Sequence, residues 1–165
     1  MKKILIALAM LAAVQVADAQ VKSPDAAAKA VTKAEAAAKD PKKAAKVATW
    51  TKLAQSYMDA YNAPAGNAWV GASKQELMLL MGAEKPLRTE DVVLADTPYV
   101  KEVYANKEFY FGQNGVLSII VVTKPVVEDA LAKALEAYKQ AHAVDVKLTK
   151  TKDINAGLEA VAKRY

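Results

Sequence analysis

The chain has 165 residues, which is the size of one domain, and it contains no cysteine. The lack of cysteine excludes disulfide bonds and thiolate chemistry, so the fold must be stabilised by packing alone. The formal charge of +5 is spread along the chain without a dense basic block, which is typical of a solvated helical surface and argues against nucleic-acid binding.

The N-terminal residues have the three parts of a secretory signal peptide. Lys2 and Lys3 form a basic start, residues 4–16 are mostly apolar, and Ala17-Asp18-Ala19 has the small-x-small form of a cleavage site. We therefore predict that residues 1–19 are removed and that the mature chain is soluble and exported, either periplasmic or secreted. No membrane span is expected, because the apolar run is shorter than the ~20 residues that a spanning helix needs.

Two helices are predicted at the start of the mature chain. Ser23 and Pro24 suit an N-cap and a first helical position, and residues 25–39 are almost all strong helix formers. Asp40-Pro41 should end this helix, because a residue before proline disfavours the α region. The next helix is predicted over residues 43–61, where apolar side chains recur at steps of three and four.

Residues 63–125 predict an inserted α+β module. Ser73 and Glu76 form a capping box that starts a short helix, and Gly82 suits its C-terminal end. A loop is expected at 83–91, and the pattern then predicts strands at 92–94, 99–104, 107–111 and 116–123. Asn114-Gly115 predicts a hairpin between the last two strands. Residues 116–123 are rich in β-branched side chains on both faces, which predicts a central strand of a small antiparallel sheet.

Helical periodicity returns after Pro125, over residues 127–144 and again over 153–165. The helices on either side of the insert carry a spaced pattern: Trp50-x-x-Leu53-Ala54-x-x-Tyr57 in the first and Ala134-x-x-x-Tyr138-x-x-Ala141 in the second. Together they resemble helices A and B of a tetratricopeptide repeat (TPR). In an ordinary repeat of ~34 residues these helices are joined by a short turn, whereas here the insert lies between them.

The TPR resemblance implies the fold class and the domain organisation. We expect a mainly α fold with a small antiparallel β insert (α+β), in which residues 20–165 form one TPR-like domain. Helix A (43–61) and helix B (127–144) would form a hairpin split by the insert at 63–125, which holds a short helix and a β-hairpin or small sheet. Residues 153–165 would start a next repeat, with further repeats possible beyond Tyr165.

The layout also resembles the N-terminal part of secreted TPR proteins of the Bacteroidetes, which begin with a signal peptide and an Ala/Lys-rich helix. TPR stacks are binding scaffolds, so the resemblance implies an exported, non-catalytic scaffold or protein–protein interaction module. Its partner would be a protein or peptide.

A second resemblance is local and starts at the capping box. Gly71-Ala72-Ser73-Lys74-Gln75-Glu76-Leu77, followed by Leu80-Met81-Gly82, is similar to a helix of small lipoproteins in the outer-membrane β-barrel assembly machinery. In those proteins a β-hairpin with a Gly-rich turn follows. This chain lacks their lipid-bearing cysteine. The resemblance implies an alternative role, as a periplasmic peptide- or glycan-binding or envelope-assembly module that acts through the insert.

The residues whose side chains could take part in catalysis or ligand binding do not form a known catalytic, cofactor or metal motif. His142 is the single histidine, and it is expected near the end of the long helix. The neighbouring acids Glu90-Asp91 and Glu128-Asp129 leave an unrecognised hydrolase as a third hypothesis, ranked below the other two. We expect that the protein is not an enzyme and has no cofactor or metal.

Four aromatic residues are candidates for a partner surface. Trp69 lies in a predicted loop beside Gly71, and Tyr99, Tyr104 and Tyr110 lie in the strand region. If the three tyrosines share the solvent face, they would form a peptide- or glycan-binding surface, because aromatic anchors dominate such sites. An exposed strand edge at 99–104 could also accept a strand from a partner.

Overall fold

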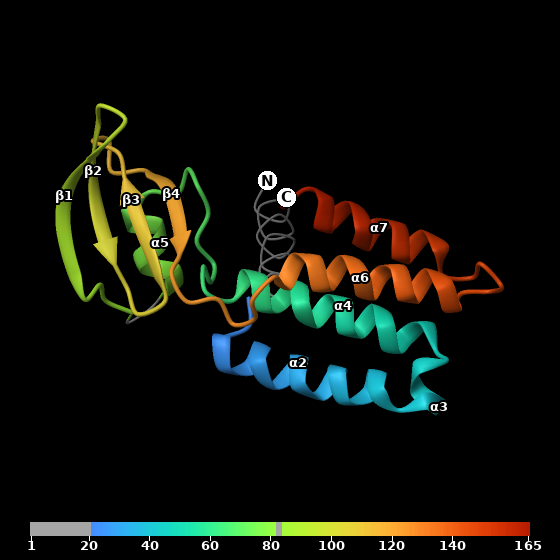
Figure 1. The fold of residues 1–165 in the computed structure, drawn as a ribbon. Coiled ribbons are helices and arrows are strands. Elements are labelled where there is room, and N and C mark those ends of the chain that lie inside the picture. The colour runs from blue at the N-terminus through green and yellow to red at the C-terminus, as the bar shows by residue number, and fades with distance from the viewer. Residues whose placement is uncertain (1–20, 82–83) are drawn as a thin grey trace, which may run out of the picture.

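The computed structural model describes residues 21–81 and 84–165. The predicted signal peptide therefore lies outside the described residues, as does Gly82. Helices α2 to α7 and one four-stranded antiparallel sheet make up the fold, which confirms the expected α+β class (Figure 1). Among the described residues, no helix combines the length and the apolar character that crossing a bilayer requires.

Four long helices form a layer, called the helical layer below. They are α2 (Pro24–Lys39), α4 (Val47–Asn62), α6 (Ala130–Val144) and α7 (Thr151–Ala162). Successive helices run in opposite directions, and α4 lies between α2 and α6 while α7 packs on α6 (Figure 1). Small side chains such as Ala54, Ala134 and Ala141 are fully buried between them, which lets the helices approach closely.

The N-terminal helices follow the predicted caps, with one difference. The Ala26 amide donates to Ser23 Oγ at 3.3 Å, Pro24 occupies the first turn, and α2 ends at Lys39 before Asp40. The helix predicted at 43–61 is divided into a short α3 (Pro41–Ala44) and α4, because Lys46 has an extended backbone, with φ of −105° and ψ of 129°. The Trp50 indole N–H donates to the Ala44 carbonyl at 2.7 Å and so fixes the break.

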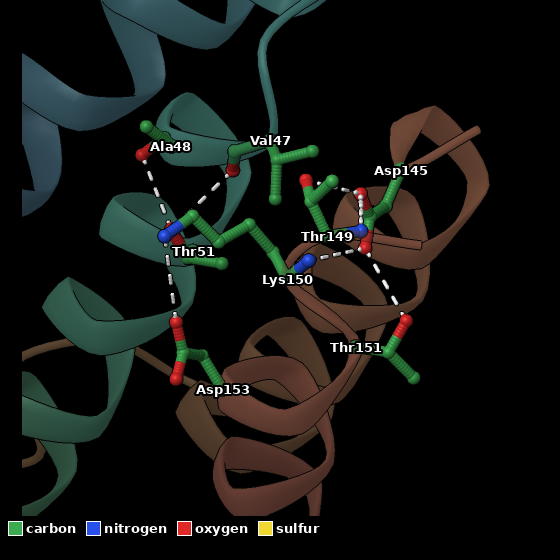
Figure 2. A network of polar contacts seen from close by, with 8 residues as sticks. All are labelled: Val47, Ala48, Thr51, Asp145, Thr149, Lys150, Thr151 and Asp153. Carbon is green, nitrogen blue, oxygen red and sulfur yellow. Dashed lines mark hydrogen bonds and ion pairs between the residues drawn. The ribbon is translucent and has the colours of Figure 1, made fainter. Parts of the chain in front are cut away.

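The later helices also differ from the prediction at their boundaries. Helix α6 begins at Ala130 instead of residue 127, because Asp129 has a φ of 55° and cannot belong to a right-handed helix. Helix α7 begins slightly earlier than predicted, at Thr151. The buried Asp145 carboxylate joins these two helices: it accepts the Lys150 amide at 2.9 Å and the Thr149 amide at 3.1 Å (Figure 2).

The insert consists of α5 (Lys74–Met81) followed by an antiparallel meander of four strands. These are β1 (Arg88–Leu94), β2 (Thr97–Val103), β3 (Lys107–Phe111) and β4 (Leu117–Val122), paired in chain order. The predicted capping box is confirmed, because the Glu76 amide donates to Ser73 Oγ at 3.2 Å and the Ser73 amide to Glu76 Oε2 at 2.7 Å. The Asn114-Gly115 hairpin between β3 and β4 is confirmed too, with Gly115 at a φ of 73°.

Two strand predictions were wrong. Strand β1 begins at Arg88, within the residues expected to form a loop. Strand β4 lies at the edge of the sheet and is not central, and its Val121 and Val122 are 38% and 39% exposed. Among the described residues no further strand covers β4. The segment before α5 pairs with its start, where the Gly71 amide donates to the Leu117 carbonyl at 2.7 Å and the Leu117 amide donates to the Ala72 carbonyl at 2.8 Å.

The helical layer and the insert have separate hydrophobic cores. In the insert, Leu77 of α5 packs on Phe109, Phe111 and Leu117 from one face of the sheet. The core of the helical layer is built by α2, α4, α6 and α7 and shares no residue with it. The insert projects from the end of the layer where α4 finishes and α6 begins (Figure 1).

Candidate functional site

The four candidate aromatic residues do not form one surface. Tyr99 and Tyr110 lie on the face of the sheet away from α5, with ring centroids 6.4 Å apart and ring planes at 86°. Tyr104 lies on the opposite face, and Trp69, which is 44% exposed, lies in the segment that leads to α5.

The structure places Tyr104 in the core of the insert, which contradicts its predicted role at a partner surface. Its side chain is 7% exposed, its ring packs 5.2 Å from that of Phe109, and its hydroxyl donates to Glu102 at 2.8 Å. Burial and the Glu102 carboxylate together raise the pKa of Tyr104. The predicted strand acceptor at 99–104 is also wrong, because β2 is paired on both sides.

The face of the sheet away from α5, called the open face, carries a network of charges that pair with one another. Lys101 lies between Glu108, at 3.0 Å, and Glu90, at 3.4 Å. The hydrogen bond to Glu108 raises the pKa of Lys101, and the same bond lowers the pKa of Glu108. Tyr110 donates its hydroxyl to Glu108 at 2.8 Å and is only 9% exposed, with Lys101 over its ring. Its ring is therefore poorly placed to stack on a sugar.

On the other face, α5 covers only part of the sheet and leaves a groove beside β1 and β2. This α5 groove has a volume of about 380 Å³. Its apolar lining includes Leu77, Met78, Tyr104 and Phe111, and Thr89 of β1 lies on its rim. An apolar cavity of this size beside an exposed strand can accept one or two side chains of a ligand.

Of the charged side chains that line the α5 groove, Lys74, Glu84 and Glu102 take part in ion pairs. The Glu102 side chain is 5% exposed, forms an ion pair with Lys74 and accepts the Tyr104 hydroxyl. Lys107, whose side chain is 4% exposed, donates to Glu84 at 2.9 Å. Among the described residues no buried side-chain nitrogen or oxygen lacks a hydrogen-bond partner. The groove thus presents an apolar floor bordered by charged side chains, most of which are held in ion pairs.

Strand β1 borders the α5 groove and is paired only with β2. Its side chains alternate between the two faces of the sheet, so Glu90 lies on the open face while Thr89, Asp91 and Val93 lie on the groove side. Glu90 takes part in the ion pairs with Lys101 and Arg88, whereas Asp91 takes part in none of the ion pairs among the described residues.

Large apolar side chains near the groove are exposed to solvent. On α5, Met78 is 68% and Leu79 is 81% exposed. Leu87 and Val93, at the two ends of β1, are 74% and 68% exposed. No local pattern indicates this surface, because it forms only when α5 packs against residues far along the chain.

The other chemical candidates lie apart from the groove. Glu90 and Asp91 point to opposite faces of the sheet, so they cannot act on one substrate together. Glu128 and Asp129 are exposed in the turn before α6, and His142 is exposed on α6. The described residues contain no cluster of three or more acidic or histidine side chains arranged to hold a metal ion.

The seven TPR-like positions lie in the helical layer. Leu53, Ala54 and Tyr57 are buried on α4, and Ala134, Tyr138 and Ala141 are buried on α6. Trp50 is partly buried and packs against the same core. These side chains therefore have a packing role and are not free to bind a partner. Comparison of the chain with protein-family models, curated proteins and solved structures finds no match.

Proposed function

We propose that the protein is an exported, non-catalytic interaction module of TPR type, in which the helical layer is the scaffold and the insert contacts a protein partner. The observation that carries this proposal is the distribution of exposed large apolar side chains. Most of them belong to the insert, and several lie on α5 and β1, the two elements that border the α5 groove. Exposed apolar groups gathered around a groove are typical of interaction sites.

The helical layer supports the scaffold part of the proposal. Its four helices bury their apolar sides against one another, and α4 packs on α2, α6 and α7. This arrangement, with A-type and B-type helices in alternation, is the one expected if α4 and α6 form a split TPR hairpin. The layer holds the insert at one of its ends (Figure 1).

Site-specific photo-crosslinking in the cells that produce the protein tests the proposal. A benzophenone amino acid at Leu79 or Val93 should capture a defined protein partner, because both side chains are exposed on α5 and β1, the elements that border the groove. The matched control is the same probe at Lys139, which is exposed on α6. Equal crosslinking from all three positions, or none from any, would contradict the proposal.

An envelope-assembly role is the second candidate. The observation that favours it is the order of elements in the insert, a capped helix followed by an antiparallel meander with a Gly-containing turn. Deleting the gene should then lower the amount of folded outer-membrane β-barrel proteins. Unchanged levels of these proteins, together with a captured partner of another kind, would leave the general interaction module as the better proposal.

Both candidates require export. N-terminal sequencing of the protein from a cell fraction outside the cytoplasm should find Gln20 as the first residue. An intact Met1 on cytosolic protein would overturn this part of the proposal.

A further inference from the structure

We propose that the insert binds an extended peptide segment by strand addition along β1, and that this segment carries a basic residue between two apolar residues at two-residue spacing. The inference rests on the proposed function and names the chemistry of the partner. It is drawn from three features of β1: its free edge, the apolar groove beside it, and the charge at its centre.

The free edge of β1 can accept a strand. All seven residues from Arg88 to Leu94 pair with β2 on one side, so the strand keeps one register over its length. Along the other edge, alternate residues direct their N–H and C=O groups outward, where they can bond to an added strand. No proline interrupts β1.

The α5 groove can accept side chains of the added strand. Successive residues of a strand point to opposite faces, so ligand residues opposite Thr89 and Val93 would lie on the groove side. Thr89 lies on the groove rim, and Met78 and Leu87 expose apolar surface near it. Apolar side chains at these two ligand positions would cover surface that is otherwise in contact with water.

The residue between them would face Asp91. This carboxylate is exposed on the groove side at the centre of β1 and is in none of the ion pairs among the described residues. A lysine or arginine opposite it would form a cross-strand ion pair. Glu90, by contrast, is already engaged by Lys101 and Arg88 on the open face.

The same charge argues against a second copy of this chain as the occupant. Two β1 strands paired antiparallel about their centre would place Asp91 opposite Asp91 of the other copy, and Glu90 next to these acids. Like charges directly opposite each other are destabilising in a sheet. The acidic centre of β1 therefore favours a basic ligand over self-association.

Fluorescence anisotropy of labelled peptides with the purified full chain tests the proposal. The probe is the peptide Ser-Val-Thr-Lys-Thr-Val-Ser, and the matched control has glutamate in place of lysine. We expect saturable binding of the lysine peptide and at least about tenfold weaker binding of the glutamate peptide. In Asp91→Lys this preference should reverse, whereas Asp153→Lys on α7, whose side chain is 71% exposed, should leave it unchanged.

Amide hydrogen exchange locates the ligand, and thermal unfolding checks that both variants remain folded. Added protection should fall on β1 and not on β4. The proposal is overturned if neither peptide binds saturably, if the preference survives Asp91→Lys, or if protection appears elsewhere. A dimer that dissociates on Val93→Lys would assign the edge to a second copy and also overturn it. If the crosslinker at Leu79 captures a partner but the peptides do not bind, strand addition is overturned and the proposed interaction module stands. If both experiments fail, the interaction module is overturned as well.

Discussion

Gly157 lies at the closest contact between α6 and α7, against the ring of Tyr138. A Cβ atom at position 157 would lie 2.2 Å from Tyr138 Cζ, far closer than van der Waals contact allows. Tyr138 is itself buried, so its ring has no free space into which it could move. This contact reverses the usual preference for alanine over glycine inside a helix.

We therefore expect Gly157→Ala to lower the free energy of unfolding by about 1–3 kcal/mol, as overpacking does. From helix propensity alone, the same change would raise the free energy of unfolding by about 1 kcal/mol. Urea unfolding of the wild type, the Gly157→Ala and Tyr138→Leu variants and the double variant checks this. The double variant should be more stable than the sum of the single changes predicts, because the leucine leaves room for the methyl group. Additive effects would show that the contact is not responsible.

Tyr57 connects α4 to α2 through a hydrogen bond from its hydroxyl to Glu35 at 2.7 Å. Burial, together with this carboxylate, raises the pKa of Tyr57 from 10.0 to about 12. The folded protein thus keeps a proton that the unfolded chain releases above pH 10. The stability from this group is complete below pH 10 and is lost as the pH rises through about 12.

In Tyr57→Phe this part of the alkaline loss should disappear, so stability should fall less steeply between pH 10 and 12 than in the wild type. At pH 8 the variant should be less stable by about 1.5 kcal/mol, because it lacks a hydrogen bond to a charged group. Chemical unfolding at a series of pH values measures both effects. Identical slopes for the two proteins would contradict the assignment.

At the scale of the elements, the α6–α7 connection depends on one side chain. The Asp145 carboxylate accepts two backbone amides and lies within 3.4 Å of the Thr149 and Thr151 hydroxyls (Figure 2). It thereby supplies acceptors for donors at the start of α7 that no helical carbonyl can reach. The connection itself has no other acidic side chain between α6 and α7.

Asp145→Ala should lower the free energy of unfolding by about 1–3 kcal/mol, because it leaves these partly buried amides without their acceptor. Asp153→Asn is the matched control, since Asp153 belongs to the same network but forms only an exposed ion pair with Lys150 at 3.8 Å (Figure 2). The Asp153→Asn control should lower the free energy of unfolding by less than about 0.5 kcal/mol. Thermal unfolding of both variants gives the comparison, and similar losses would refute a special role for Asp145.

The elements that the sequence predicted correctly carry local signals. The Ser73 and Glu76 capping box and the Asn114-Gly115 turn depend on neighbouring residues, so the pattern alone locates them. The β1–β2 hairpin lacks such a signal, because its turn is Ala95-Asp96, with φ values of 46° and 61°. Asn and Gly are the usual residues for these angles, so the turn residues do not indicate this hairpin.

The predicted aromatic partner surface required its tyrosines to lie on one face of the sheet. Tyr99 and Tyr104 are five positions apart, and an odd step along a strand already puts them on opposite faces. This signal could have shown that the two tyrosines do not share a face, whereas the place of Tyr110 depends on its pairing with Lys101 of the neighbouring strand. The α5 groove had no comparable signal, because it lies between Met78 of α5 and Thr89 of β1, and their contact depends on tertiary packing.

At the scale of the whole molecule, two cores stabilise two parts of one chain. The core of the helical layer does not include residues of the sheet, and α4 and α6 pack directly on each other on either side of the insert. The cost of closing a long loop also grows only slowly with its length. The helical layer should therefore fold without the insert.

Replacing residues 66–124 with a short Gly/Ser linker should leave a helical protein that unfolds cooperatively. Circular dichroism during heating checks this, with the full chain as the reference. Hydrogen exchange of the full chain should accordingly divide the protected amides into a helical group and a sheet group. A shortened chain that is disordered would mean that the insert is required for the helices to fold.

Two connecting segments attach the insert to the helical layer: one follows α4 and the other leads into α6 (Figure 1). A module attached by a single linker can rotate about that linker relative to the rest of the protein. Two attachments restrict this rotation. Rotation of the helical layer would therefore turn β1 with it and set the direction in which a bound segment runs. A partner bound at the edge of β1 would therefore have a defined orientation relative to the helical layer, and to any molecule that the helical layer contacts.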